Sequence, residues 1–335
     1  MGCRAILLVV LLLFFKESIG YSFDVTPLRV GDAVNTSQAR ILEDRYRRRA
    51  EQPFVSPKLS EMPKKSEIEY GFRLLSQTSS LLGPNAPDTK LRISKNNLNC
   101  THCHQAGESG LPGTKPYSIP WTNVLNDYPK LDVKTMKVIS LEDRIIGMLG
   151  KASAPEIRKS REVRAIISYM TWLSSKSQPN MRMAGTGLLD MSYPDRPSDP
   201  KRGRELYQEK CISCHGAEGK GSPQADFKKG GGYVFPPIAG NDTYDDGGHM
   251  YLVPLFARFI LVNMPLGATA EKPILTVDQA LDISAYVNSE LNRTHSVDRK
   301  KFYPDPEFRE KGFAVPESFD RGPASFQKAK FGPFK

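Results

Sequence analysis

Apolar residues recur at three- and four-residue intervals in several segments of the chain, which is the spacing of one face of an α-helix. The clearest case spans residues 155–175, where Pro155 suits the first helical turn. Its apolar stripe is formed by Ile166, Ile167, Met170 and Leu173. Further helices are expected at residues 37–51 with Ser37 as the candidate cap, at 66–76, at 140–151, from Asp199 onward, near 251–263 and near 276–291. The pattern predicts a mainly α fold.

The helical periodicity is lost at residues 176–200, which collect proline, glycine, serine and three methionines, and it restarts afterwards. A chain of 335 residues is also long for a single core, so two domains are expected. The 26 glycines and 26 prolines predict irregular loops in both. The expected bounds are a signal peptide at 1–20, a basic N-terminal extension at 21–63, a first domain at 64–178, a linker at 179–197, a second domain at 198–292 and an extended C-terminal tail at 293–335.

The first twenty residues have the composition of a cleavable signal peptide. Arg4 precedes an unbroken apolar run at 5–15, and small residues stand near position 20, where a signal peptidase cuts. The run is too short to span a bilayer. Cys3 comes before the run, which argues against a lipid-modified cysteine at the mature N-terminus. We therefore expect an exported, periplasmic protein with no stable membrane anchor.

Two copies of the pentapeptide Cys-x-x-Cys-His carry the strongest chemical signal. In each copy two thiols stand one helical turn apart, where they can form thioethers to the two vinyl groups of one haem, and an imidazole follows for the iron. The residues are Cys100, Cys103 and His104 in the first copy and Cys211, Cys214 and His215 in the second. A zinc knuckle would need four nitrogen or sulfur ligands, and a thioredoxin-like pair would need a βαβ context. The motifs predict two covalently bound haem c groups.

The formal net charge of +10 raises the question of nucleic-acid binding. The basic residues are dispersed, however, and no helix-turn-helix, zinc finger or aromatic RNA-binding motif accompanies them. We expect no nucleic-acid partner. A positive surface in the periplasm is better suited to steer an acidic redox partner, such as another cytochrome, or a small inorganic anion.

The restart of the pattern after residue 200 is an internal duplication. Gly71 and Leu75 precede the first motif much as Gly203 and Tyr207 precede the second. The segment 167–169 likewise echoes 283–286 in the closing helices. This arrangement resembles class I cytochromes c, in which the first and last helices cross closely and a glycine admits an aromatic residue. The resemblance implies two class I cytochrome c domains in tandem.

The distal iron ligands must come from residues outside the two motifs, and His, Met, Cys and Lys are the candidate residue types. Of the histidines outside the proximal positions, His102 lies in the turn of the first motif and His295 lies beyond the last helix, so methionine is expected. For the second haem Met264, in a Met-Pro loop of the kind common in class I cytochromes, rivals Met250, in a glycine-rich loop with His249 beside it. Methionine also serves as a gap filler in cores.

Several segments together resemble the dihaem thiosulfate dehydrogenases, from about residue 66 to the C-terminus. They are 97–99, 141–145, 169–174, 233–240, 245–250, 263–267 and 331–334. Members of that family oxidise two thiosulfates to tetrathionate in the periplasm, and some catalyse the reverse reaction. The resemblance implies that the second haem takes its distal ligand from the glycine-rich loop, which favours Met250 and gives His249 the place of a switching ligand.

The chain departs from that family at one important position. The family has a cysteine as distal ligand of the haem at which thiosulfate reacts, and here the position corresponds to Met148, with Arg144 nearby as a candidate anion-binding residue. A thioether donates less electron density to iron than a thiolate does. We therefore expect a periplasmic dihaem electron-transfer protein. An active thiosulfate dehydrogenase or tetrathionate reductase is the alternative, and a haem redox sensor ranks below both.

Overall fold

The computed structural model describes residues 28–150, 155–292, 297–315 and 322–335. The predicted signal peptide lies outside these residues. Within them, helices predominate and the strands are short, which confirms the mainly α prediction. The elements are α1 Thr36–Arg47, β1 Glu51–Gln52, α2 Glu67–Ser76, α3 Thr78–Leu82, α4 Val124–Asp127, β2 Lys130–Asp132, β3 Lys137–Ile139, α5 Leu141–Met148, α6 Pro155–Arg158, α7 Arg161–Leu173, β4 Arg182–Met183, α8 Pro200–Lys210, α9 Ile212–His215, β5 Ser222–Pro223, β6 Tyr233–Phe235, α10 Val253–Asn263, α11 Val277–Ser289 and α13 Pro323–Phe331.

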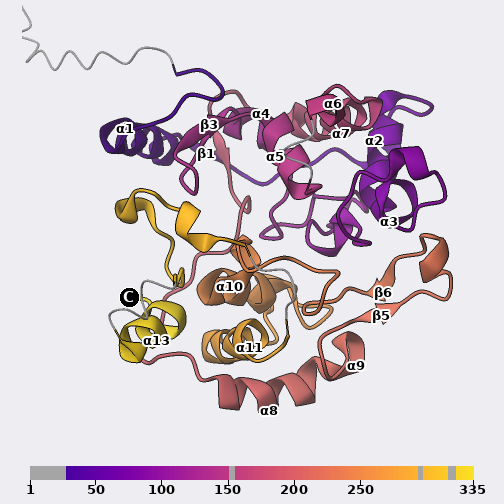
Figure 1. The fold of residues 1–335 in the computed structure, drawn as a ribbon. Helices are drawn as coiled ribbons and strands as arrows, with labels where there is room; N and C mark the ends of the chain where they lie inside the picture. The colour runs from indigo at the N-terminus through magenta and orange to yellow at the C-terminus, as the bar shows by residue number, and fades with distance from the viewer. Residues whose placement is uncertain (1–27, 151–154, 293–296, 316–321) are drawn as a thin grey trace, which may run out of the picture.

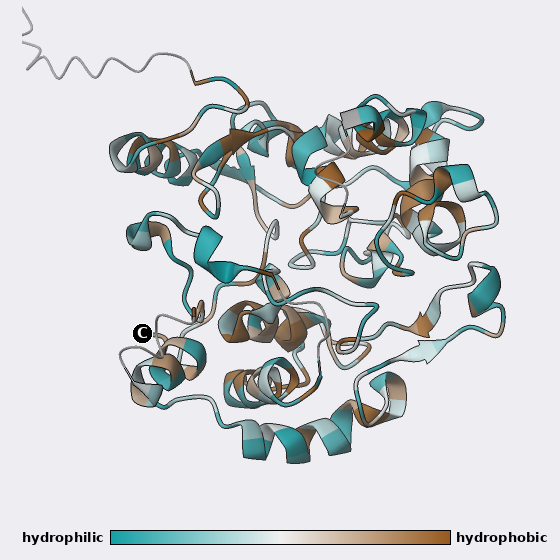
Figure 2. Cartoon of the chain, in the orientation of Figure 1, coloured by the Kyte–Doolittle hydropathy of each residue, from teal (hydrophilic) through white to brown (hydrophobic). Residues whose placement is uncertain are grey.

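The helices form two groups, α2–α7 above and α8–α11 below in Figure 1. Each group encloses its own apolar core. The first core is built mainly from α2, α5 and α7, and the second from α8, α10 and α11. Figure 2 shows how hydropathy differs between helices of the second group, where α10 is hydrophobic and central while α8 is hydrophilic along its outer side.

The observed helix bounds correct three sequence expectations, two of them through side-chain caps. The side chain of Asn35, not Ser37, caps α1 by accepting the N–H of Gln38 at 3.0 Å. The helix expected at 155–175 is divided, because Ser160 accepts the N–H of Val163 at 3.2 Å and starts α7 anew. The helix expected at 140–151 ends at Met148.

The same close helix crossing occurs in both groups. A Cβ atom added to Gly71 in α2 would lie 2.0 Å from the carbonyl oxygen of Ala165 in α7. A Cβ added to Gly203 in α8 would lie 1.9 Å from the carbonyl oxygen of Asp282 in α11. The aromatic residue of the partner helix, Tyr169 or Tyr286, has its Cβ 2.9 Å from the added atom in either case. The duplication read from the sequence is therefore also a duplication of packing.

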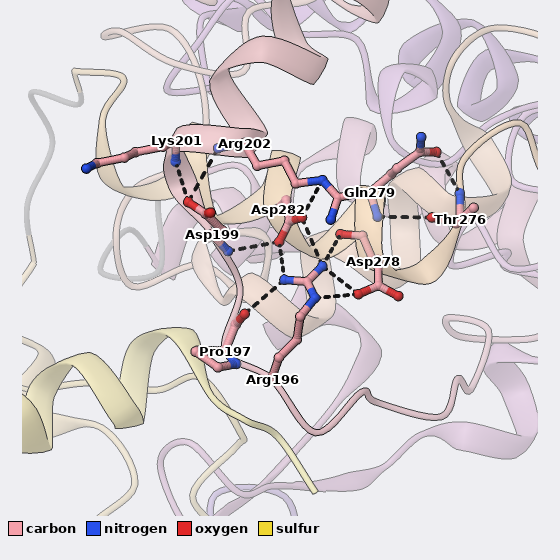
Figure 3. A network of polar contacts seen from close by, with 9 residues as sticks. All are labelled: Arg196, Pro197, Asp199, Lys201, Arg202, Thr276, Asp278, Gln279 and Asp282. Atoms are coloured by element: carbon pink, nitrogen blue, oxygen red, sulfur yellow. Dashed lines mark hydrogen bonds and ion pairs between the residues drawn. The ribbon is translucent and has the colours of Figure 1, made fainter.

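A buried carboxylate fastens the start of the second group. Asp282 is fully buried and accepts hydrogen bonds from Arg196 Nη1 at 2.8 Å, Arg196 Nη2 at 2.9 Å and the N–H of Asp199 at 2.8 Å (Figure 3). Arg202 approaches the same carboxylate at 3.6 Å. Asp199 in turn caps α8. The linker, the start of α8 and the middle of α11 are thus tied at one point.

Two segments pass from one group to the other. The β5–β6 hairpin extends from the second group toward α3, at the right of Figure 1. Its tip is seated by Ser79, whose Oγ donates to the carbonyl of Gly230 at 3.0 Å, and a Cβ on Gly232 would meet that Oγ at 2.4 Å. The β2–β3 hairpin packs against α1 and the C-terminal segment. No described helix is long and apolar enough to cross a membrane.

Candidate haem sites

The first Cys-x-x-Cys-His motif forms a 3-10 turn, Cys100–His102, held by the end of α2 and the start of α3. The N–H of Cys100 donates to Thr78 Oγ1 at 3.2 Å, and Thr78 Oγ1 donates to the carbonyl of Leu74 at 2.8 Å. Asn99 Oδ1 accepts the N–H of Ser79 at 2.9 Å. These bonds fix both thiols at the open side of the first core.

The second motif continues directly from α8 into α9. The N–H of Cys211 donates to the carbonyl of Tyr207 at 2.9 Å, so the first thiol is placed by the last turn of α8. The hydroxyl of Tyr207 donates to the carbonyl of Gly216 at 2.7 Å and closes the turn after His215. Tyr207 is thereby connected to both ends of the motif.

The two proximal histidines are oriented in the same way. Nδ1 of His104 lies 2.7 Å from the carbonyl oxygen of Ile119, and Nδ1 of His215 lies 2.8 Å from that of Pro236. A carbonyl only accepts, so Nδ1 carries the proton and the lone pair is on Nε2. Burial lowers the pKa of both rings, against the opposing effect of these carbonyls, which keeps the imidazoles neutral. A neutral imidazole fixed through Nδ1 is the usual state of a metal-ligating histidine.

The sequence alone did not identify the carbonyls that orient these rings. Ile119 has a φ of 54°, a left-handed conformation that is unfavourable for a β-branched residue. Strain of this kind persists where the surrounding structure enforces it, often at functional sites. Trp121, two residues later, packs on the His104 ring with centroids 4.6 Å apart. A β-branched residue with positive φ leaves no mark in a single sequence.

The four motif cysteines are free thiols. No disulfide joins them. Burial raises the pKa of the Cys100 thiol, and burial raises those of Cys103 and Cys211 to about 11, which keeps these three side chains protonated. The described residues also contain no cluster of three or more His, Cys, Asp or Glu side chains that could hold a metal ion.

Met148 stands at the last position of α5. It lies seven residues after the buried Leu141 and so shares the apolar face of the helix. Unlike Leu141 and Ile145, it is 62% exposed, although the next residue, Leu149, is buried in the first core. A large apolar side chain with this exposure does not fill a gap in the core.

The rival ligands of the second site lie at the two ends of α10. Met250, in the 3-10 turn His249–Tyr251, and Met264, the C-cap of α10, are both partly buried against the second core. The carbonyl of Met250 accepts Nδ2 of Asn288 at 3.0 Å, which ties that turn to α11. His249 is exposed and faces a cavity. The choice between Met250 and Met264 stays a prediction.

Arg144 lines that same cavity, whose volume is about 850 Å³ and which lies between α1, α10 and residues 307–311 of the tail. Its guanidinium donates to Asp132 at 3.4 Å and to the hydroxyl of Tyr128 at 3.3 Å. The neighbouring Arg158 and Arg161 form ion pairs with Asp143 and Glu67. Arg144 is therefore already neutralised in part, in a wall of mixed charge.

His102 makes a contact that its place within the first motif did not suggest. Its Nδ1 accepts the N–H of Asn99 at 3.2 Å, while the backbone of Tyr233, in β6 of the second group, hydrogen-bonds the ring. Burial lowers the pKa of His102 to about 4 against the effect of that backbone bond, so the ring is neutral at pH 7.

Comparison with known proteins agrees with these observations. The sequence profile of the cytochrome c family matches residues 200–290. The chain is 32% identical to the thiosulfate dehydrogenase of Allochromatium vinosum over 66% of its own length and 76% of that protein. It is also 32% identical to those of Psychrobacter arcticus and Stutzerimonas stutzeri, over 63% and 58% of its own length, and it spans 61% and 60% of theirs.

The solved structure of the thiosulfate dehydrogenase TsdBA from Marichromatium purpuratum has a similar fold. It superposes with a TM-score of 0.62 at 27% sequence identity, covering 82% of this chain and 54% of that one. Since the aligned part extends over most of the present chain, the similarity includes both helical groups and is not confined to the segment that matches the cytochrome c profile.

Proposed function

Because this chain belongs to the thiosulfate dehydrogenase family of c-type cytochromes, which bind haem c, we propose that it is a periplasmic electron-transfer protein with two haem groups. Cys100, Cys103 and His104 hold one haem, and the second motif, 211–215, holds the other. Bound haem supplies a one-electron redox centre at each motif. The chain's own residues position the motif cysteines and orient the imidazoles.

One observation supports two haems more than any other, namely that both motifs are built alike. Each has a buried imidazole whose Nδ1 is fixed by a backbone carbonyl, at 2.7 Å in one case and 2.8 Å in the other. Each also follows a helix that crosses its partner at a glycine. A decayed second motif would have no reason to keep the orientation of a ligand.

The stoichiometry is tested by intact-mass measurement of protein expressed with the haem-attachment machinery. We expect a mass increment of two haems in the unaltered protein. The double variant Cys211→Ser/Cys214→Ser should retain one haem, and so should Cys100→Ser/Cys103→Ser. A single haem in the unaltered protein, removed by only one of these variants, would contradict the proposal.

For the distal positions we propose Met148 at the first haem and Met250 at the second, with Met264 as the rival of Met250. The exposure of Met148, a large apolar side chain at the end of α5 that is not packed into the core, supports the first assignment. The variants Met148→Ala, Met250→Ala and Met264→Ala should be compared by absorption spectroscopy, with Met181→Ala as the control. Loss of the methionine-type band identifies a ligand, and a Met148→Ala spectrum identical to that of the control would refute that assignment.

The names of the relatives favour a second candidate, a thiosulfate dehydrogenase or tetrathionate reductase that works with methionine at the first haem. Arg144 and Lys130 contribute positive charge to a cavity wall that also holds Asp132, and they are the residues expected to contact a sulfur oxyanion. A steady-state assay with thiosulfate and ferricyanide as acceptor separates the two functions. Turnover at rates typical of enzymes, about 1 s⁻¹ or more, would show that the protein is an enzyme and not only an electron carrier.

A further inference from the structure

Lys95 touches both segments that carry the candidate distal ligands. Its backbone N–H donates to the carbonyl of Leu149 at 3.0 Å, immediately after Met148. Its aliphatic stem packs against Gly150, where an added Cβ would lie 2.5–2.8 Å from three carbons of the Lys95 side chain. The end of α5 therefore rests on Lys95.

The ammonium group of the same residue reaches the other helical group. Lys95 Nζ donates to Asp245 Oδ2 at 3.0 Å, and the two side chains are 39% and 24% exposed. Asp245 opens the glycine-rich segment that leads to Met250, and its other oxygen, Oδ1, accepts the N–H of Gly247 at 3.1 Å. Burial acts to raise the pKa of Asp245, but Lys95 and the Gly247 N–H outweigh it and lower the pKa overall.

Two further residues of the first group hold the same segment. Asn97 donates to Asp242 from its N–H at 2.9 Å and from its Nδ2 at 3.1 Å. Lys134, in the β2–β3 turn, donates to the carbonyl of Gly247 and lies 3.8 Å from the centroid of the Phe302 ring. The segment 242–250 is thus anchored by the first group at three places, although it belongs to the second.

We propose that Lys95 is a positioning residue that couples the two distal-ligand segments, so that the end of α5 and the 245–250 loop do not shift independently. A change of ligation or redox state that displaces one segment is then transmitted to the other through Lys95, whose backbone contacts Leu149 and whose ammonium contacts Asp245. This inference rests on the proposed function, since it requires a haem at each motif. It adds a role for a residue that lies in neither motif.

The test uses the full-length holoprotein and the variants Lys95→Met, Asp245→Asn and the two combined. Lys95→Met keeps the stem that packs on Gly150 and removes only the charge. Lys90→Met, at an exposed lysine of the same group, is the control for loss of a positive charge. In every variant the haem count is measured first, by intact mass, and the methionine-type band and the redox titration of both haems follow.

We expect Lys95→Met and Asp245→Asn each to lower the ratio of methionine-ligated to otherwise ligated protein by about threefold, within the range for a partly exposed ion pair. The double variant should show no further loss, because both single changes remove the same contact. Lys95→Met should also alter the redox titration of the second haem, and Asp245→Asn should alter that of the first.

The inference would be overturned if both single variants bind two haems and give the same spectra and redox titrations as the Lys90→Met control. That result would leave the proposed function intact. A haem count below two in the unaltered protein would overturn both. If Lys95→Met yields no holoprotein, Asp245→Asn decides alone, since it breaks the contact from the other group.

Discussion

The glycine at each helix crossing lies directly against the backbone of the partner helix, and Gly203→Ala tests this close approach directly. The added Cβ would lie 1.9 Å from the carbonyl oxygen of Asp282, whereas Cβ atoms in proteins are essentially never within 3.0 Å of another heavy atom. Relief requires a displacement of about 1.1 Å. The oxygen cannot move alone, because it belongs to the middle of α11 and the Asp282 side chain is fixed by Arg196.

The size of the effect follows from two opposing contributions. Overpacking in a close-packed region costs about 1–3 kcal/mol, and a clash with backbone lies at the upper end. Alanine is favoured over glycine in a helix interior by about 1 kcal/mol, which offsets part of the loss. The net destabilisation of the second group is therefore about 2 kcal/mol. With a urea m-value of about 1–3 kcal/mol per M, the unfolding midpoint should fall by about 0.7–2 M.

The assay is urea unfolding of the holoprotein followed at the methionine-type band, with Gln208→Ala on the exposed side of α8 as the control. The control should shift the midpoint little, since exposed substitutions change stability by about 0.5 kcal/mol or less. Gly71→Ala should behave like Gly203→Ala, because its added Cβ would lie 2.0 Å from the carbonyl of Ala165. If Gly203→Ala unfolds at the same urea concentration as Gln208→Ala, the close crossing does not exist in solution.

Two further predictions concern buried and capping carboxylates. Asp282→Ala leaves the Arg196 guanidinium without its buried partner and should cost about 3 kcal/mol, measured by urea unfolding; a loss below about 1 kcal/mol would contradict the network of Figure 3. At the start of α5, burial acts to raise the pKa of Asp143, but Arg158 and the Ser140 cap lower it overall. The carboxylate therefore contributes stability above its ordinary pKa of about 3.9, and this is lost as the pH falls through the lower folded value. A pH series of unfolding midpoints should show the acid loss shrink in Asp143→Asn, and an unchanged series would contradict it.

The sequence predicted those parts of the structure that depend on short-range patterns. The crossing glycines were found because the second half repeats the first, whereas the proximal ligands, which follow from a five-residue spacing, stay a prediction. The cap of α1 was misplaced by two positions, since Asn35 and Ser37 are both good caps and only the observed contact of Gln38 with Asn35 separates them.

The contacts between the two groups could not be foreseen in this way. Lys95 and Asp245 are 150 positions apart, and each alone reads as an ordinary surface charge. The strained conformation of Ile119 is likewise enforced from outside, since its N–H donates to the carbonyl of Gly187 at 3.0 Å while its own carbonyl faces His104. Such features depend on how segments meet, and a single sequence contains no record of that.

The seat of the β5–β6 hairpin has a consequence for how the protein matures. The hairpin rests on Ser79 through Gly230, and its strand β6 reaches His102 between the two thiols of the first motif. An enzyme that attaches a group to Cys100 and Cys103 therefore meets the hairpin beside the first motif once the hairpin has docked. The hairpin is made more than a hundred residues after those cysteines, so synthesis itself delays the moment at which it reaches the first motif. The order of the segments along the chain thus leaves the first motif without this neighbour while the second group is still being made.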